Sequence, residues 1–195
     1  MAEKIIEEFD ATRITNFAIK FKGDEQASSF GCVGKIEGSS ESVAIVKKCE
    51  AVEKKRKSKV QKMVLTLSAH VKVATLRRIF GIKNNGLKPG VYRYGTDSIG
   101  EDFTLTATAI DEFEDEQKLI AFSNCANNTG FKITVENGVE EVAELELEYT
   151  ALPDVSNGIY YEAYLAELDE VTKEQFVSDW HSNFTPELVK AIDEV

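Results

Sequence analysis

Three glutamates form the most regular set of chemically capable side chains in this sequence. Glu144, Glu146 and Glu148 alternate with apolar residues, which is the two-residue repeat of a strand with one buried face. Carboxylates can serve as metal ligands or as an acid–base pair. Alternate residues of one strand, however, stand about 7 Å apart in a row and do not form a cage. We therefore predict an acidic row on the exposed face of a strand.

No catalytic constellation accompanies this row. Neither His70 nor His181 has a second histidine at ligand spacing, and no serine stands in a GxSxG elbow. Gly31, Gly34 and Lys35 superficially suggest a phosphate loop, but the GxxxxGK[ST] spacing is missing and no helical pattern follows. The sequence predicts a protein that is not an enzyme and that needs neither a metal nor a cofactor.

Basic residues gather in one short stretch, which contains Lys54, Lys55, Arg56, Lys57 and Lys59. The stretch has no interleaved aromatic residues and no known nucleic-acid-binding motif. The whole chain has a net charge of −11, which opposes binding to phosphates. We favour a contact loop for an acidic protein surface over the alternative, a nucleic-acid-binding loop.

Charge is divided unevenly along the chain. Before Asp111 there are 19 basic and 13 acidic residues, and from Asp111 onward there are 4 basic and 21 acidic residues. A molecule with one basic loop and an acidic remainder can associate head to tail with copies of itself. The plainer interpretation is a solvated hairpin tip and an acidic, solubilising surface. Charge alone leaves both interpretations open.

Strands are the elements expected to position most of these side chains. β-prone runs on both sides of the lysines predict a long hairpin over residues 41–69 with a basic tip. Apolar residues from Val73 to Phe80 share one helical face, and Gly81 stands where a C′ glycine belongs. This pattern predicts one short helix that packs across the sheet.

The glutamate row is expected on the second strand of another hairpin. Residues 131–135 and 143–149 alternate between apolar and polar side chains on either side of Asn137 and Gly138. A two-residue turn would mix the buried and exposed faces of this hairpin. We therefore expect a three-residue loop or a bulge, with a positive φ at Asn137 or Gly138.

The two ends of the chain differ from the middle. Residues 1–12 have the character of an arm. The spacing after Thr172 fits a capping box, and Thr185 precedes Pro186 as an N-cap would, so two short helices are predicted near the end. We expect a β domain over residues 1–165, with the arm 1–12 and the hairpin 41–69, and a helical extension over 166–195.

The cysteines indicate a reducing site of synthesis. Cys32, Cys49 and Cys125 stand singly, without a CxxC motif. The first residues lack the pattern of a signal peptide, and no apolar run approaches the length of a membrane span. We expect synthesis in the cytoplasm and no insertion into a membrane.

Several segments follow one another in a recognisable order. After the charged hairpin come residues 68–81, 90–95, 118–125, 136–138, 141–153 and 157–161. Together they resemble the major tail protein, or tail tube protein, of the long-tailed siphophages of Gram-positive bacteria. The resemblance covers roughly residues 12–165 and includes no catalytic motif.

This resemblance implies a mainly β fold, a tail-tube-like β-sandwich with one flanking α-helix. It implies a structural virion protein that forms hexameric rings, stacked into a tube through which double-stranded DNA passes into the host. The implied partners are further copies of the chain, the tape measure protein and the tail terminator. The implied locations are the phage tail and, during assembly, the host cytoplasm.

The resemblance also gives roles to the charged residues. The hairpin would bridge subunits or rings, with Lys54, Lys55, Arg56, Lys57 and Lys59 as its electrostatic contact. A conduit for DNA should repel its cargo, so the glutamate row is a candidate for the wall of the lumen. The alternative function is a virion β-sandwich module that binds a receptor or a glycan. Such a module would expose aromatic residues in a groove, whereas the aromatics here fall mostly on apparent core faces.

Overall fold

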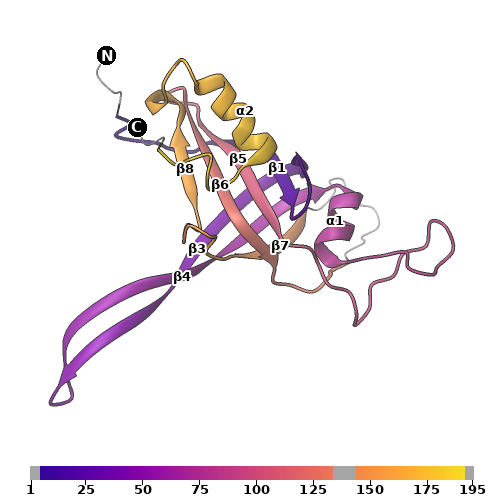
Figure 1. The fold of residues 1–195 in the computed structure, drawn as a ribbon, viewed down its shortest axis with the longest axis horizontal. Helices are drawn as coiled ribbons and strands as arrows, with labels where there is room; N and C mark the ends of the chain where they lie inside the picture. Colours follow the sequence, from indigo (N-terminus) through magenta and orange to yellow (C-terminus); the bar gives the residue numbers. More distant parts are fainter. Residues whose placement is uncertain (1–4, 134–143, 192–195) are drawn as a thin grey trace.

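The structure, a computed structural model, describes residues 5–133 and 144–191, and strands are its main elements (Figure 1). The strands are β1 (Arg13–Phe21), β2 (Ser28–Ser29), β3 (Gly31–Cys49), β4 (Val52–Val71), β5 (Phe103–Asp111), β6 (Glu116–Asn127), β7 (Leu145–Ala151) and β8 (Tyr161–Tyr164). The helices are α1 (Val73–Phe80) and α2 (Lys173–Asn183), with a 3-10 turn at Leu165–Glu167. The predicted mainly β fold with a flanking helix is confirmed.

All these strands belong to one antiparallel sheet. Its order is β2-β1-β5-β6-β7-β4-β3, and β8 pairs with β6 beside this path. Only Phe30 separates β2 from β3, so the chain itself joins the two ends of the order. The Phe30 N–H donates to the Phe17 carbonyl at 3.1 Å, and the Lys72 N–H donates to the Phe30 carbonyl at 3.2 Å. The sheet therefore curls until its outer strands meet, and the predicted sandwich is one sheet folded over on itself.

One apolar core fills the inside of the curled sheet. Successive residues of a strand point to opposite faces, so every second residue contributes to this core. Ile79 and Phe80 add the buried face of α1. The main side chains that the strands bury here are Phe17, Ile19, Phe21, Leu65, Leu67, Phe103, Leu105, Phe122, Leu147 and Tyr149. Removal of this apolar area from water is the main force that holds the strands together.

The short helix α1 has the predicted bounds and the predicted end. Gly81 follows it in the left-handed conformation, with φ of 65°, and its N–H donates to the carbonyl of Arg78. The backbone of Ile99 lies directly against Gly81, so any side chain at this position would collide with it. Glycine is required here both for the conformation and for the close approach.

The helix α2 covers the outer face of the sheet over β1, β5 and β6 (Figure 1). Leu119 and Ala121 of β6 point away from the main core and form a second cluster with Trp180 and Phe184. The Trp180 Nε1–H donates to the Ile120 carbonyl at 3.1 Å. The predicted helix after Thr172 is thus confirmed and packs on its own sheet, although the Thr172 side chain makes no capping hydrogen bond.

The second C-terminal helix that the sequence predicts is wrong for the residues that the structure describes. Residues 186–189 form a turn, in which the Leu188 N–H donates to the Thr185 carbonyl at 3.0 Å. A segment this short gains too little from its own hydrogen bonds to form a helix. Leu188 and Val189 instead pack against the Trp180 cluster from the turn.

The hairpin predicted around Asn137 and Gly138 is only partly open to comparison, because both residues lie outside the described ranges. Residues 131–133 are described and do not form a strand, so that part of the prediction is wrong. Phe131 instead packs on α1, with its ring centroid 5.3 Å from that of Phe80. β7 pairs with β4 along its whole length and with the end of β6.

Candidate functional site

The longest hairpin of the sheet projects from the body as an arm (Figure 1). β4 pairs with β7 only from Met63 to Ala69, so residues 41–62, here called the arm, pair only with each other among the described residues. Almost every side chain of the arm is exposed on both faces of the ribbon. A two-stranded ribbon without a core is marginally stable in water, which makes the arm a candidate contact surface.

The turn of the arm lies earlier in the sequence than the lysines. Glu50 and Ala51 form it, with φ of 51° and 63°, the left-handed backbone that a two-residue hairpin turn requires. The prediction that the lysines form the tip is therefore wrong, since they lie on the strand that returns from it. Dense positive charge suggests a loop in the sequence, but both faces of this ribbon meet water and charge costs little there.

Strand register divides the predicted contact residues between two faces. Lys55, Lys57 and Lys59 lie opposite Lys47, Ile45 and Val43, and these six residues share one face, here called the lysine face. Arg56 lies opposite Val46 on the other face, where its Nε donates to Glu53 Oε1 at 2.8 Å. Lys54 is the unpaired residue of a bulge. The structure thus brings together only three of the five predicted contact residues.

The glutamate row lies on the outer face of the curled sheet. Glu146 and Glu148 belong to β7 and alternate with Leu147 and Tyr149, which point into the core. Glu148 accepts a hydrogen bond from Asn128 Nδ2 at 2.9 Å. Glu144 precedes the strand, and its carboxylate lies over Gly34 of β3, where a side chain would collide with it. Glu146 and Glu148 thus lie in a row along β7, whereas Glu144 lies before the strand and reaches toward β3.

His181 holds α2 to the sheet in a way that the sequence analysis missed. Its Nε2 is 2.9 Å from Thr108 Oγ1, and its Nδ1 is 3.3 Å from Thr106 Oγ1. Both threonines are buried under the helix. Burial of the ring lowers the pKa of His181 and favours the neutral form. The alternating threonines of β5 were visible in the sequence, but nothing there indicated that a helix 70 residues away would cover them.

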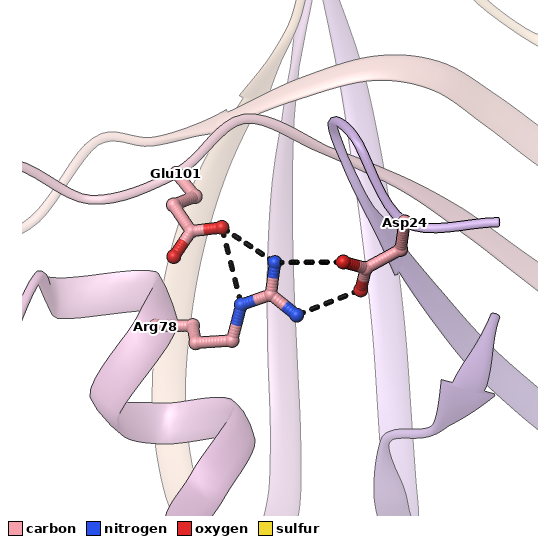
Figure 2. Close-up of polar contacts among 3 residues, drawn as sticks. All are labelled: Asp24, Arg78 and Glu101. Carbon is pink, nitrogen blue, oxygen red and sulfur yellow. Dashed lines mark hydrogen bonds and ion pairs between the residues drawn. The ribbon is translucent and has the colours of Figure 1, made fainter. Parts of the chain in front are cut away.

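A second polar cluster joins three separate segments (Figure 2). Arg78 of α1 donates to both carboxylate oxygens of Asp24, at 2.7 and 3.1 Å, and its Nε donates to Glu101 at 3.1 Å. The guanidinium also stacks over the Phe21 ring, 4.0 Å from its centroid. Hydrogen bonds to Glu101 and Asp24 raise the pKa of Arg78, and the bond from Arg78 lowers the pKa of Asp24. The cluster fastens the segment between α1 and β5 to the body.

One cleft of about 630 Å³ lies between the ends of β1 and β5 and the turn after α2. The aromatic residues of its lining, Phe21, Phe103 and Phe184, are buried and offer no exposed ring on which a sugar could stack. Asp154 at its rim is fully engaged, because it accepts from Ser123 Oγ and Tyr161 Oη at 2.7 Å each. This cleft does not favour the glycan-binding alternative.

Two further findings concern the described residues alone. Within residues 5–133 and 144–191, no three His, Cys, Asp or Glu side chains lie where they could hold a metal ion together. In the same ranges neither helix has the length and apolar character needed to cross a membrane. The three cysteines are free thiols, with Cys32 and Cys49 exposed and Cys125 buried.

No protein-family model matches this sequence, and no curated protein is significantly similar to it. Among solved structures, the chain is similar to the anti-feeding prophage cap, a tube terminating cap studied by cryo-electron microscopy. The two chains are 12% identical over 83% of this chain and 96% of that chain, with a TM-score of 0.44. A likeness of this degree identifies neither a shared function nor a shared partner.

Proposed function

We propose that this chain is a structural virion protein that assembles into stacked hexameric rings and forms a phage tail tube. The tube is the conduit for double-stranded DNA, and its other partners are the tape measure protein and the tail terminator. The β domain, residues 1–165, builds the ring, and the extension, residues 166–195, adds an outer layer. The protein acts in the virion after assembly in the host cytoplasm.

The observation that carries this proposal is the arm. Residues 41–62 extend beyond the body and expose one basic face, while the sequence from Asp111 onward has 21 acidic and 4 basic residues. A basic projection and an acidic body are complementary between copies of one chain. Repeated contacts between two different surfaces generate rings or open filaments. The order of segments that resembles siphophage tail tube proteins supports a ring.

The glutamate row supports the conduit within this proposal. Glu146 and Glu148 lie on the outer face of the sheet, and the exposed Glu144 directly precedes their strand, so the three can line a channel formed by several copies. DNA carries one negative charge for about every 1.7 Å of helix axis, so a carboxylate wall does not bind it. The arm lysines belong, in this proposal, to contacts between subunits and stay outside the lumen.

Electron microscopy of the concentrated protein tests the proposal. Six-fold rings or hollow tubes are the expected result. A sample that contains only single globular particles at every concentration would contradict it. A DNA-binding protein with a basic loop would instead show binding to double-stranded DNA that weakens steeply with added salt.

A further inference from the structure

The lysine face of the arm lacks partners within its own chain. Val43 and Ile45 are 48% and 63% exposed at its centre. In the part of the chain that the structure describes, none of the four lysines of this face forms an ion pair. Two aliphatic side chains flanked by four unpaired cations form a surface that suits an apolar group with acidic neighbours.

The opposite face of the same ribbon is different. Arg56 is bound by Glu53 through two hydrogen bonds, at 2.8 and 3.1 Å. Ser58 Oγ donates to Ser42 Oγ at 2.8 Å across the strands. These contacts pair Arg56, Ser42 and Ser58 within the arm, whereas Lys48, opposite Glu53 on this face, forms no ion pair among the described residues. The lysine face thus gathers four unpaired cations around two aliphatic side chains, against one unpaired lysine on the opposite face, and is the stronger candidate for a contact.

A surface of matching chemistry lies at the turn between β5 and β6. Phe113 stands at this turn and is 81% exposed. The turn is firmly built, because the buried carboxylate of Asp111 accepts from the N–H groups of Asp10, Phe113 and Glu114, at 2.8, 2.9 and 3.3 Å. These bonds, the one from Asp10 first, lower the pKa of Asp111. An ordered turn that holds a phenylalanine in water, with Glu114 and Asp115 beside it, has the character of an interaction site.

The arm and the β5–β6 turn belong to strands that are not neighbours in the sheet. The arm leaves the sheet at Met63, which lies in one row with Ala151, Cys125 and Phe103 across β7, β6 and β5. Both the arm and the turn extend from this row to the same side, and no ion pair among the described residues joins the arm lysines to Glu114 or Asp115. A contact between these unlike surfaces therefore joins different copies and can repeat from copy to copy.

We propose that the lysine face of the arm docks on the β5–β6 turn of a second copy of this chain. Phe113 packs on Val43 and Ile45, and Glu114 and Asp115 lie beside Lys55, Lys57 and Lys59. This contact deepens the proposed function, because it names the two surfaces through which copies associate. It stands separately from the hexameric ring, since the same contact would also produce an open filament.

Cross-linking of the wild-type protein tests the contact directly. A carbodiimide that joins amines to carboxylates without a spacer is applied to a mixture of ¹⁴N- and ¹⁵N-labelled chains. Mixed-isotope peptides that join Lys55, Lys57 or Lys59 to Glu114 or Asp115 are the expected products. Their absence among intermolecular products, or products confined to other carboxylates, would overturn the proposal.

Paired variants supply the matched control. Lys57→Glu with Lys59→Glu should weaken association by about tenfold or more in sedimentation velocity at low ionic strength, as should Phe113→Ser. Lys48→Glu with Lys54→Glu changes the same charge outside the lysine face and should leave association nearly unchanged. Combining Lys57→Glu with Glu114→Lys should restore part of the affinity.

The outcomes separate this contact from the tube. Tubes that form equally well from the Lys57→Glu, Lys59→Glu variant would leave the proposed function intact and overturn the docking. Specific cross-links without rings or tubes would support the docking and contradict the proposed tube. A protein that stays monomeric at all concentrations would contradict both. Equal loss in both paired variants would overturn the docking by showing only a general charge effect.

Discussion

At the scale of single residues, His181 makes stability sensitive to acid. Its buried ring lies between two threonine hydroxyls, and burial lowers its pKa below the ordinary value of 6.5. In the unfolded chain the ring binds a proton near pH 6.5, whereas in the folded protein it stays neutral to a lower pH. The contribution of His181 to stability is therefore lost as the pH falls below about 6.5.

Urea unfolding at several pH values checks this effect. Between pH 7.5 and 5.5, wild-type protein should lose more stability than His181→Gln, whose amide also bonds hydroxyl groups but does not titrate. Parallel pH curves for the two proteins would show that His181 is protonated equally in both states and would refute the assignment.

Tyr149 is a core position at which a substitution should not lower the free energy of unfolding. Its side chain is fully buried, and its hydroxyl has no hydrogen-bond partner among the described residues. A buried hydroxyl without a partner destabilises the folded state. Tyr149→Phe should therefore leave the free energy of unfolding unchanged or raise it by up to about 1 kcal/mol. A loss of 2 kcal/mol or more in chemical denaturation would reveal a partner for this hydroxyl.

The residue patterns correctly predicted which face of a strand points into the core. They did not predict which distant element packs on the opposite face. The alternation of Glu146 and Glu148 with Leu147 and Tyr149 correctly separated the outer face from the core. The contacts of His181 with Thr106 and Thr108 could not be predicted from the sequence, because the two threonines and the histidine are more than 70 residues apart. Burial of a polar stripe depends on which distant element covers it, and local spacing does not encode that.

At the scale of elements, the arm should be separable from the body. Ser40 and Met63 are paired directly across the ribbon, so an Asn-Gly dipeptide in place of residues 41–62 closes a two-residue turn. The body should fold with a change in unfolding free energy below about 1 kcal/mol, because the arm buries little of the core. Circular dichroism and urea unfolding measure this, and sedimentation should show loss of association.

One result of the arm deletion would contradict this prediction. If the shortened chain folds and still associates with unchanged affinity, the arm is not the contact between copies. The full-length chain at the same concentration is the control.

Elements with local signals were predictable, and those that depend on distant partners were not. The helix α1 has an apolar face and a C′ glycine within nine residues, and its bounds agree with the prediction. The hairpin of β3 and β4 was also expected, although its turn was misplaced because lysines were interpreted as a loop. β7 pairs along its whole length with β4, more than 70 residues earlier in the sequence, and with the end of β6, whereas the sequence suggested the neighbouring residues 131–135 as its partner.

At the scale of the whole molecule, the distribution of charge bears on the passage of DNA. If Glu144, Glu146 and Glu148 line a lumen, replacing all three with glutamine removes a repulsive wall but leaves the arm untouched. Genome ejection from virions with this variant should slow, while tubes still assemble. Ejection kinetics measured by dye release, with Glu170→Gln as a surface control, check the effect. Unchanged kinetics would remove these residues from the lumen.

The mass of the smallest closed assembly distinguishes a six-membered ring from every other mode of association. In the proposed assembly, unlike surfaces of one 21.7 kDa chain join copies into a ring of six. Native mass spectrometry of the concentrated full-length protein should therefore show a dominant species of six chains, about 130 kDa, and multiples of it where rings stack. A protein that remains a single 21.7 kDa chain at every concentration, or that stops at a dimer, would contradict the hexameric ring.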